Sequence, residues 1–277
     1  MSKETTYISQ NEILRVEKLT VDFPGKQVAT RVLSDVDISI RKGEILGLVG
    51  ASGSGKSVLA RCFLRLESPA KIISGSIFMA GENLMMKSQR EMQKIRGKNI
   101  SLVPQNSLGA FDPLFTVGNQ FQEVIAAHKD LFFNEGAGRK RRKKNFREKI
   151  YDFLGAVGIS APQSRSLLYP HQWSAGMRQR ALIAMALCLS PNVLILDEVV
   201  SALDPTICLH LLDLILRIRE RYGTSILFIS HDMDVIHEIC DRVAVMHSGR
   251  IVEEARVREI FNQPLHPYAR SLVSRVL

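Results

Sequence analysis

The stretch VGASGSGKSV, residues 49–58, decides the fold of this chain. It contains the pattern GxxxxGK[ST] without departure, which is the spacing of a loop that binds phosphate groups. The segment EILGLVG at 44–50 is continuously apolar and ends in glycine, which predicts a strand buried on both faces. A helix is expected to begin near Lys56 and to run through SVLARCFLRL. This order of strand, loop and helix separates a phosphate-binding loop from a flexible run of glycine and serine.

The loop offers several groups to a phosphate. Its glycines allow backbone turns that a side chain would block, so that several N–H groups point into one concavity. The start of the following helix adds partial positive charge. The Lys56 side chain is expected to reach the β- and γ-phosphates, and the Ser57 hydroxyl is a natural ligand of Mg²⁺. The residues predicted to contact the nucleotide are Gly50, Ala51, Ser52, Gly53, Ser54, Gly55, Lys56, Ser57 and Val58.

Two acidic residues end a second apolar segment. NVLILD, residues 192–197, predicts a buried strand, and Glu198 follows it directly. Sheets of the α/β class bind ligands at the carboxyl ends of their strands, so Asp197 and Glu198 are expected near the loop. There Asp197 would hold Mg²⁺, usually through water, and Glu198 would polarise a water for in-line attack. Solvated acids also end many strands, so the pair gains weight from the loop upstream.

The remainder of the chain alternates between predicted strands and helices. We expect strands over 13–23, 33–40, 75–80, 224–230 and in RVAVMHS and RIVEE, and helices near 205–221 and 232–240. From about residue 83 to 166 helix formers prevail, with Thr116 as a candidate N-cap and NEGAGRKRRKKN as a connection between helices. One amphipathic helix there has an apolar face of Phe146, Ile150, Phe153, Leu154 and Val157. The alternation predicts a parallel, doubly wound α/β sheet with a helical lobe.

Composition excludes several classes of protein. The chain has 277 residues, 45% of them hydrophobic, and a net charge of +9. No run approaches the roughly 20 apolar residues that cross a bilayer, and the start MSKETTYISQNE lacks the features of a secretory signal. We therefore expect an intracellular protein that reaches a membrane through a partner. The four cysteines, Cys62, Cys188, Cys208 and Cys240, have no CxxC spacing and indicate small buried side chains.

Part of the positive charge is concentrated in RKRRKK, Arg139–Lys144. Such a run is typical of a solvated surface helix or loop. Contact with anionic lipid or an acidic partner is a second interpretation. Nucleic acid is the third and least favoured interpretation, because the run contains no aromatic side chains that could stack on bases.

Three further segments resemble the ATP-binding subunit of ABC transporters. WSAGMRQRALIAMAL at 173–187 precedes the acidic strand, SALD at 201–204 follows it, and SHD lies at 230–232. Phosphate loop, glutamine loop, signature helix, acidic strand, D-loop and switch histidine follow in order over nearly the whole chain. The resemblance implies a P-loop ABC-type α/β nucleotide-binding domain over residues 1–277 with a small antiparallel β region. It also implies an inserted helical subdomain at about 83–190 and a carboxy-terminal extension at about 250–277.

The resemblance assigns roles to single residues. Gln105, in VPQNS, would contact Mg²⁺ and couple the helical lobe to a membrane partner. His231 would bond the γ-phosphate and position the attacking water. Ser174 and Gly176, at the start of the signature helix, would bind the γ-phosphate held by another subunit. The implied catalytic residues are Lys56, Gln105, Glu198 and His231, the magnesium residues are Ser57, Gln105 and Asp197, and the nucleotide contacts also include Phe23, Ser174, Gly176 and Asp204. Phe23 would stack on adenine, although a phenylalanine that ends a strand is equally typical of a core.

Two departures from the family pattern concern the geometry of the site. Ala175 replaces the first of two usual glycines, and its methyl group disfavours positive φ, so a weakened second anion site is expected. Val199 and Val200 replace a proline and a threonine after Glu198. The catalytic acid is unchanged, but the geometry of its loop is in question.

Two segments narrow the branch of the family. LVPQNSLGAFDPLFTVGNQ at 102–120 and FNQPLHPYARSLV at 261–273 resemble the importers of peptides and nickel, with His266-Pro267-Tyr268 distinctive in the second. The chain stops at Leu277 without the cysteine-containing extension of many peptide-importing relatives. This favours a nickel-type or a divergent peptide-type subunit. The seven histidines lack metal-ligand spacing, so they do not indicate a nickel site.

The resemblance implies an ATPase that couples ATP binding and hydrolysis to uptake of peptides or of nickel and other metal complexes. The expected cofactors are ATP and Mg²⁺, and the expected location is the cytoplasmic face of the inner membrane, as a peripheral subunit. Expected partners are two membrane-spanning permease subunits, a second ATP-binding subunit and, indirectly, an extracytoplasmic solute-binding protein. A different second ATP-binding chain is favoured over another copy of this one, and no nucleic acid is expected.

Two alternatives stay open. The basic run motivates a non-transport ABC ATPase that acts on nucleic acid or ribosomes. Ala175, Val199 and Val200 motivate a regulatory nucleotide-binding subunit with low turnover.

Overall fold

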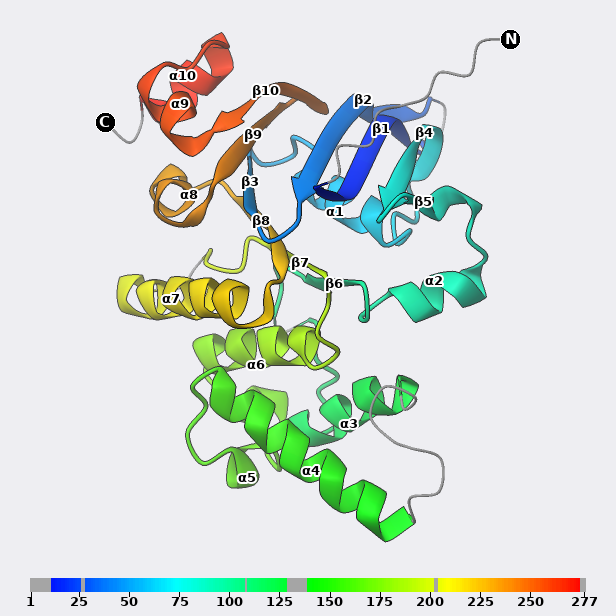
Figure 1. The fold of residues 1–277 in the computed structure, drawn as a ribbon, viewed down its shortest axis with the longest axis vertical. Coiled ribbons are helices and arrows are strands. Elements are labelled where there is room, and N and C mark those ends of the chain that lie inside the picture. Colours follow the sequence, from blue (N-terminus) through cyan, green and yellow to red (C-terminus); the bar gives the residue numbers. More distant parts are fainter. Residues whose placement is uncertain (1–10, 26–27, 108, 129–138, 202–203, 275–277) are drawn as a thin grey trace.

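Two sheets and a group of helices make up the fold (Figure 1). The computed structural model describes residues 11–25, 28–107, 109–128, 139–201 and 204–274, without the side chains of residues 139–146. The strands occupy the upper part of the molecule in Figure 1, and a group of helices between residues 117 and 187 occupies the lower part.

The main sheet has the strand order β10-β9-β3-β8-β7-β6. Its strands are β3 (Ile45–Val49), β6 (Ile100–Val103), β7 (Val193–Asp197), β8 (Ser225–Ser230), β9 (Arg242–His247) and β10 (Arg250–Arg256). The strands from β9 to β6 run parallel, and β10 pairs antiparallel with β9. Every residue of β3, β7 and β8 is buried, because both faces of the sheet are covered. The predicted parallel, doubly wound sheet is confirmed.

A second, antiparallel sheet has the order β2-β1-β4-β5. Its strands are β1 (Glu12–Phe23), β2 (Thr30–Arg41), β4 (Lys71–Met79) and β5 (Glu82–Asn83). Alternate residues of β3 point to different cores. Leu46 and Leu48 pack with α1 (Lys56–Phe63) and the antiparallel sheet. Ile45 and Val49 face the larger core, which is formed with α6 (Ala175–Leu187), α7 (Pro205–Tyr222) and α8 (Met233–Ile239). The helix that follows the phosphate loop is therefore held between two sheets.

The lower helices form a lobe beside the main sheet (Figure 1). They are α3 (Val117–Ala127), α4 (Arg139–Ala156), α5 (Pro162–Arg165) and α6 (Ala175–Leu187). The Thr116 hydroxyl accepts a 3.3 Å bond from the Asn119 N–H, so the predicted N-cap is confirmed. Ile150 and Leu154 of α4 and Val157, directly after it, are buried as predicted. Phe153 is half-buried, and the Phe146 side chain lies outside the described residues.

The structure corrects four sequence predictions. Ile100–Val103 forms β6, an unpredicted strand of the main sheet inside the stretch expected to be helical. Helix α1 ends at Phe63, before the predicted end, and β4 begins at Lys71 instead of residue 75. Helix α4 begins at Arg139, so the basic run is helical and is not part of a connection between helices. Lysine and arginine have high helix propensity, which explains this last difference.

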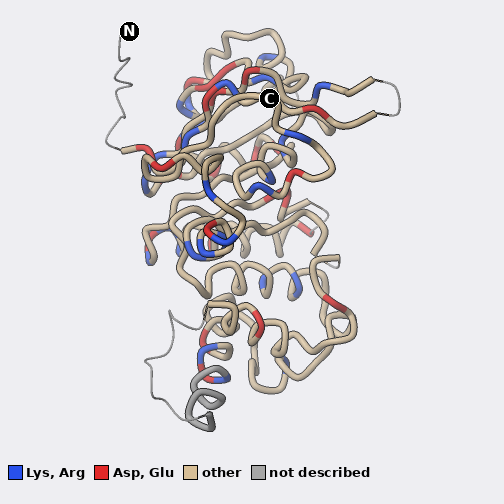
Figure 2. Tube along the Cα trace, turned by 90° about the vertical axis from the view of Figure 1, so that its right-hand side faces the viewer, with Lys and Arg blue, Asp and Glu red and all other residues tan. Residues whose placement is uncertain are grey.

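Further helices complete the described chain. They are η1 (Leu84–Met86), α2 (Gln89–Ile95), η3 (Pro170–Gln172), α7 (Pro205–Tyr222), α8 (Met233–Ile239), α9 (Val257–Asn262) and α10 (Pro267–Val273). Among the described residues, no helix has the length and apolarity to cross a membrane. Basic and acidic residues are interspersed over the described trace (Figure 2).

Candidate nucleotide-binding site

The predicted site residues lie at one edge of the main sheet. The phosphate loop follows β3, His231 follows β8, Asp197 and Glu198 end and follow β7, and Gln105 lies two residues after β6. These strands are neighbours in the sheet and run parallel, so their carboxyl ends meet at the same edge. Segments far apart in the sequence thereby converge on one place.

The phosphate loop depends on two glycines. A Cβ atom at Gly50 would lie 2.2 Å from the Met246 carbonyl oxygen, so no larger residue fits. Gly55 has φ of 107° and precedes α1 directly, a left-handed conformation that favours glycine. The Ser54 hydroxyl is buried and has no hydrogen-bond partner among the described residues. A tight turn with an unpaired buried donor fits the phosphate oxygens that the sequence predicts here.

Lys56 is folded back onto the loop. Its Nζ atom donates to the carbonyl oxygens of Gly50 at 2.8 Å and Ala51 at 3.0 Å, and it lies 3.9 Å from Glu198 Oε1. The side chain is 4% exposed. Burial lowers the pKa of Lys56, while the carboxylates of Glu198 and Asp197 act in the opposite direction. An ammonium group held by two carbonyls in a buried site is prepared to pair with a phosphate.

Ser57 and Asp197 contact each other directly. The Ser57 hydroxyl donates a 3.1 Å bond to Asp197 Oδ1. Burial raises the pKa of Asp197, whereas the bond from Ser57 lowers it. A hydroxyl and a carboxylate are oxygen donors of the kind that Mg²⁺ prefers, so these two residues fit the predicted cation.

The Glu198 carboxylate is the meeting point of three predicted residues. Oε2 accepts a 2.6 Å bond from Gln105 Nε2 and lies 3.6 Å from His231 Nδ1. Oε1 faces Lys56. The Glu198 side chain is 13% exposed, whereas that of His231 is 60% exposed. A shielded acid beside an open histidine is suited to hold a water that enters from solvent.

The loop after Glu198 is fixed by short-range bonds and burial. Glu198 has φ of 50°, a strained conformation that persists only where the surroundings enforce it. Its carbonyl oxygen accepts bonds from the Ser201 N–H at 3.2 Å and the Ser201 hydroxyl at 2.7 Å. Val199 and Val200 are 2% and 8% exposed and pack in the larger core. The two valines thus anchor the loop that holds the acid.

The signature residues lie at the start of α6. Ser174 is the N-cap and accepts a 3.3 Å bond from the Met177 N–H. Ala175 is the first helical residue and does not have positive φ, so the backbone reason for a weaker site does not apply in this structure. A Cβ atom at Gly176 would lie 3.1 Å from Ile207 Cγ2 on α7. Gly176 therefore sets how closely α6 and α7 approach.

Some predicted residues are not brought together. Within the described residues, no hydrogen bond or ion pair joins Phe23, Ser174, Gly176 or Asp204 to the phosphate loop. The Asp204 carboxylate instead accepts a 2.9 Å bond from the Ile207 N–H and caps α7. Phe23 is half-buried at the end of β1 and packs against the smaller core. Residues 202–203 of the predicted D-loop lie outside the described residues.

One contact to the loop is not predicted by the sequence. The Ala51 N–H donates a 2.8 Å bond to the Tyr268 hydroxyl. His266-Pro267-Tyr268 is a distinctive segment in the sequence, yet nothing in the pattern indicates which part of the chain it contacts. The only signal for this role is the segment itself.

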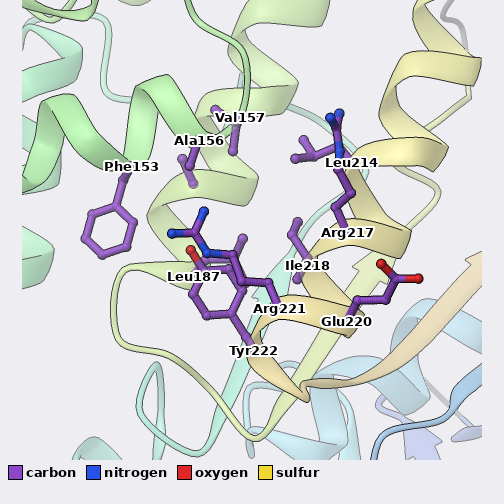
Figure 3. Close-up of a pocket in the computed structure, with 11 residues that line it drawn as sticks. Phe153, Ala156, Val157, Leu187, Leu214, Arg217, Ile218, Glu220, Arg221 and Tyr222 are labelled. Atoms are coloured by element: carbon purple, nitrogen blue, oxygen red, sulfur yellow. The ribbon is translucent and has the colours of Figure 1, made fainter.

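An apolar pocket of about 460 Å³ lies away from this site, between α4, α6 and α7 (Figure 3). Its wall includes Phe153, Val157, Leu187, Ile218 and Tyr222. None of the predicted site residues lines it, so it plays no part in the chemistry described above.

Comparison with known proteins identifies the family. The family model of the ABC transporter matches residues 33–201. A probable peptide ABC transporter ATP-binding protein of Sinorhizobium fredii is 42% identical over 266 residues, covering 95% of this chain and 76% of the relative. The oligopeptide transport ATP-binding protein OppD of Lactococcus lactis is 38% identical over 267 residues, covering 96% and 76%. The chain therefore belongs to the ABC transporter family, and it is an ATP-binding subunit with ATPase chemistry.

Solved structures share the fold. A bacterial ABC transporter cassette solved as a dimer aligns with a TM-score of 0.75 at 23% identity, over 88% of this chain and 99% of that chain. The cbiO1 protein of Clostridium perfringens, part of an ABC transporter complex, aligns with a TM-score of 0.73 at 26% identity, over 91% and 92%. The ABC-type nucleotide-binding fold that the sequence implies is confirmed.

Proposed function

We propose that this chain hydrolyses ATP to drive uptake of peptides through partner membrane subunits, and that residues 1–277 act as one ATP-binding domain. The observation that carries the proposal is the convergence of Lys56, Asp197, Glu198 and His231 at the carboxyl edge of neighbouring strands. The peptide cargo is supported by relatives named as oligopeptide and dipeptide transport proteins. Nickel has no comparable support among them.

The residues of the chain divide the work of hydrolysis. The loop N–H groups and the Lys56 ammonium bind the β- and γ-phosphates and offset their charge. Glu198 holds the attacking water and accepts its proton as the water oxygen bonds to the γ-phosphorus. The bond between the γ-phosphorus and the β,γ-bridging oxygen breaks, and ADP leaves with that oxygen. His231 orients the same water from the open side, and Gln105 fixes the Glu198 carboxylate.

Ser57 and Asp197 would hold Mg²⁺. Gln105 lies close to them, because it contacts Glu198, the residue after Asp197. When bound, Mg²⁺ would neutralise the charge that develops on the phosphate oxygens. The fit rests on their oxygen donors and their direct contact.

A second ATP-binding subunit would complete the site. Ser174 and the backbone at Gly176 begin a helix of thirteen residues, whose N-terminus favours an anion. This helix start makes no bond to the phosphate loop of its own chain among the described residues, which supports a role toward the nucleotide of a partner. A different partner chain is favoured over a second copy of this one.

Two permease subunits would transmit the work, at the cytoplasmic face of the membrane. An apolar hollow of about 340 Å³ lies between β6, α3 and α6 and is lined by Leu66, Leu102, Pro104, Val124 and Met185. Pro104 adjoins Gln105, which contacts Glu198. A permease segment seated in this hollow would contact Pro104, and the next residue, Gln105, contacts the catalytic acid Glu198. A solute-binding protein would deliver the cargo to the permeases.

Reconstitution in liposomes tests the proposal. The chain is purified in detergent with two permease subunits and its ATP-binding partner, and ATP-dependent uptake of a labelled oligopeptide is measured against uptake of Ni²⁺. We expect peptide uptake that stops when Glu198→Gln replaces the wild-type chain. Uptake of Ni²⁺ alone, or recovery of the chain with ribosomes or DNA instead of permeases, would contradict it.

A further inference from the structure

Tyr268 of α10 contacts the phosphate loop across 217 sequence positions. Its hydroxyl accepts a 2.8 Å bond from the Ala51 N–H. That N–H belongs to the same planar peptide unit as the Gly50 carbonyl, and the Gly50 carbonyl accepts the 2.8 Å bond from Lys56. One peptide unit is therefore held at its oxygen by Lys56 and at its nitrogen by Tyr268.

The turn before α10 is built to present Tyr268. The Glu253 carboxylate of β10 accepts bonds from the N–H groups of Leu265 at 2.9 Å and His266 at 2.8 Å. His266 Nδ1 accepts a 3.1 Å bond from the Tyr268 N–H and caps α10. Pro267 occupies the first helical position, where its fixed φ suits a helix start. The distinctive segment of the sequence thus fixes the place of the tyrosine.

A contact with the main sheet holds the Tyr268 ring in place. It packs on His247, the last residue of β9, with ring centroids 4.0 Å apart and an angle of 36° between the planes. Strand β9 is the neighbour of β3, so the ring lies at the same edge as the phosphate loop. Ala269 and Val273 of α10 are buried in the larger core. The hydroxyl is therefore carried on a fixed element.

We propose that Tyr268 is a positioning residue of the nucleotide site, which fixes the Gly50–Ala51 peptide so that the loop keeps its phosphate-binding shape. Hydrogen bonds that share one peptide group polarise each other, so loss of the Tyr268 bond also weakens the hold on Lys56. The carboxy-terminal helices thereby set the affinity for ATP. The inference rests on the proposed role of residues 50–57 as the site of the ATP phosphates.

The test is the substitution Tyr268→Phe in the full chain, which removes the hydroxyl and keeps the ring. We expect Kd for ATP with Mg²⁺, measured by calorimetry, to rise by about three- to tenfold, the effect of one ordinary hydrogen bond. The turnover number at saturating ATP should stay near the wild-type value, because the loop is still filled. The matched control is Tyr222→Phe, since Tyr222 lies in the separate pocket between α4, α6 and α7 (Figure 3).

Ala51→Pro provides a second arm, because proline has no N–H to donate. In this background Tyr268→Phe should have no further effect on Kd, since both changes remove the same bond. Additive effects would overturn the inference, as would a Tyr268→Phe protein with wild-type Kd or one that loses only thermal stability. If Ala51→Pro does not fold, the single substitution with its control still decides. A wild-type chain that does not bind ATP would instead overturn the proposed function.

Discussion

At the scale of single residues, Lys56 carries the binding of the phosphates. Its ammonium is buried and is held by the carbonyls of Gly50 and Ala51. We predict that Lys56→Ala weakens ATP binding by about ten- to a hundredfold, because hydrogen bonds to a charged group are lost. Calorimetric titration with ATP measures the change.

The matched control for Lys56 is Lys71→Ala, which changes an exposed lysine at the start of β4. That variant should bind ATP like the wild type. Equal affinities in the Lys56 and Lys71 variants would show that the buried ammonium is not the phosphate ligand.

The residues that a sequence predicts well are those at the ends of apolar strands. Asp197 ends a buried strand, and Glu198, His231 and the loop that carries Lys56 follow buried strands. Parallel strands bring their carboxyl ends to one edge of the sheet. Tyr268 could not be predicted in this way. Its role depends on a bond between α10 and the loop that no local pattern contains.

At the scale of elements, two matched helix caps allow an effect on stability to be distinguished from an effect on ATPase activity. Thr116 caps α3 and Ser174 caps α6 with the same geometry, a hydroxyl that accepts a 3.3 Å bond from an N–H. We predict that Thr116→Ala lowers stability by about 1 kcal/mol and Tm by about 2–4 °C. Its ATPase activity should not change, because α3 contributes no group to the site.

Ser174→Ala should cost similar stability and should also lower the ATPase activity of the assembled complex. Thermal melts and phosphate release of both variants measure the two effects. A complex in which the Ser174 variant hydrolyses ATP as fast as the Thr116 variant would contradict a role of α6 at the nucleotide of a partner.

The sequence predicts the short strand β6 and the start of α4 least well. Strand β6 has four residues, and a run that short gives no periodicity to distinguish it from its polar surroundings. It is a strand because β7 offers a partner edge, with Ile100 opposite Val193. The start of α4 at Arg139 was missed because the charge of the basic run suggested a loop.

At the scale of the whole molecule, the burial of the four free cysteines in the two cores predicts how fast each thiol reacts. Burial raises the pKa of Cys62 and Cys188 to about 12 and also raises the pKa of Cys240. At pH 8 these thiols are therefore protonated and poorly nucleophilic. The half-buried Cys208 of α7 also has a raised pKa, but it is the most accessible of the four.

We predict that a disulfide reagent at pH 8 modifies Cys208 first and the other three only after unfolding in denaturant. Absorbance of the released thiolate and mass spectrometry of the peptides follow the order. Equal, fast modification of all four in the native protein would contradict the described packing.

The central claim is that Glu198 activates water for attack on ATP held by the phosphate loop. Phosphate release by the assembled complex, compared between the wild type and Glu198→Gln, tests it most directly. The variant is predicted to bind ATP with unchanged affinity and to hydrolyse it slower by about a hundredfold or more, the range of general base catalysis. A Glu198→Gln complex that hydrolyses ATP at nearly the wild-type rate would contradict the account.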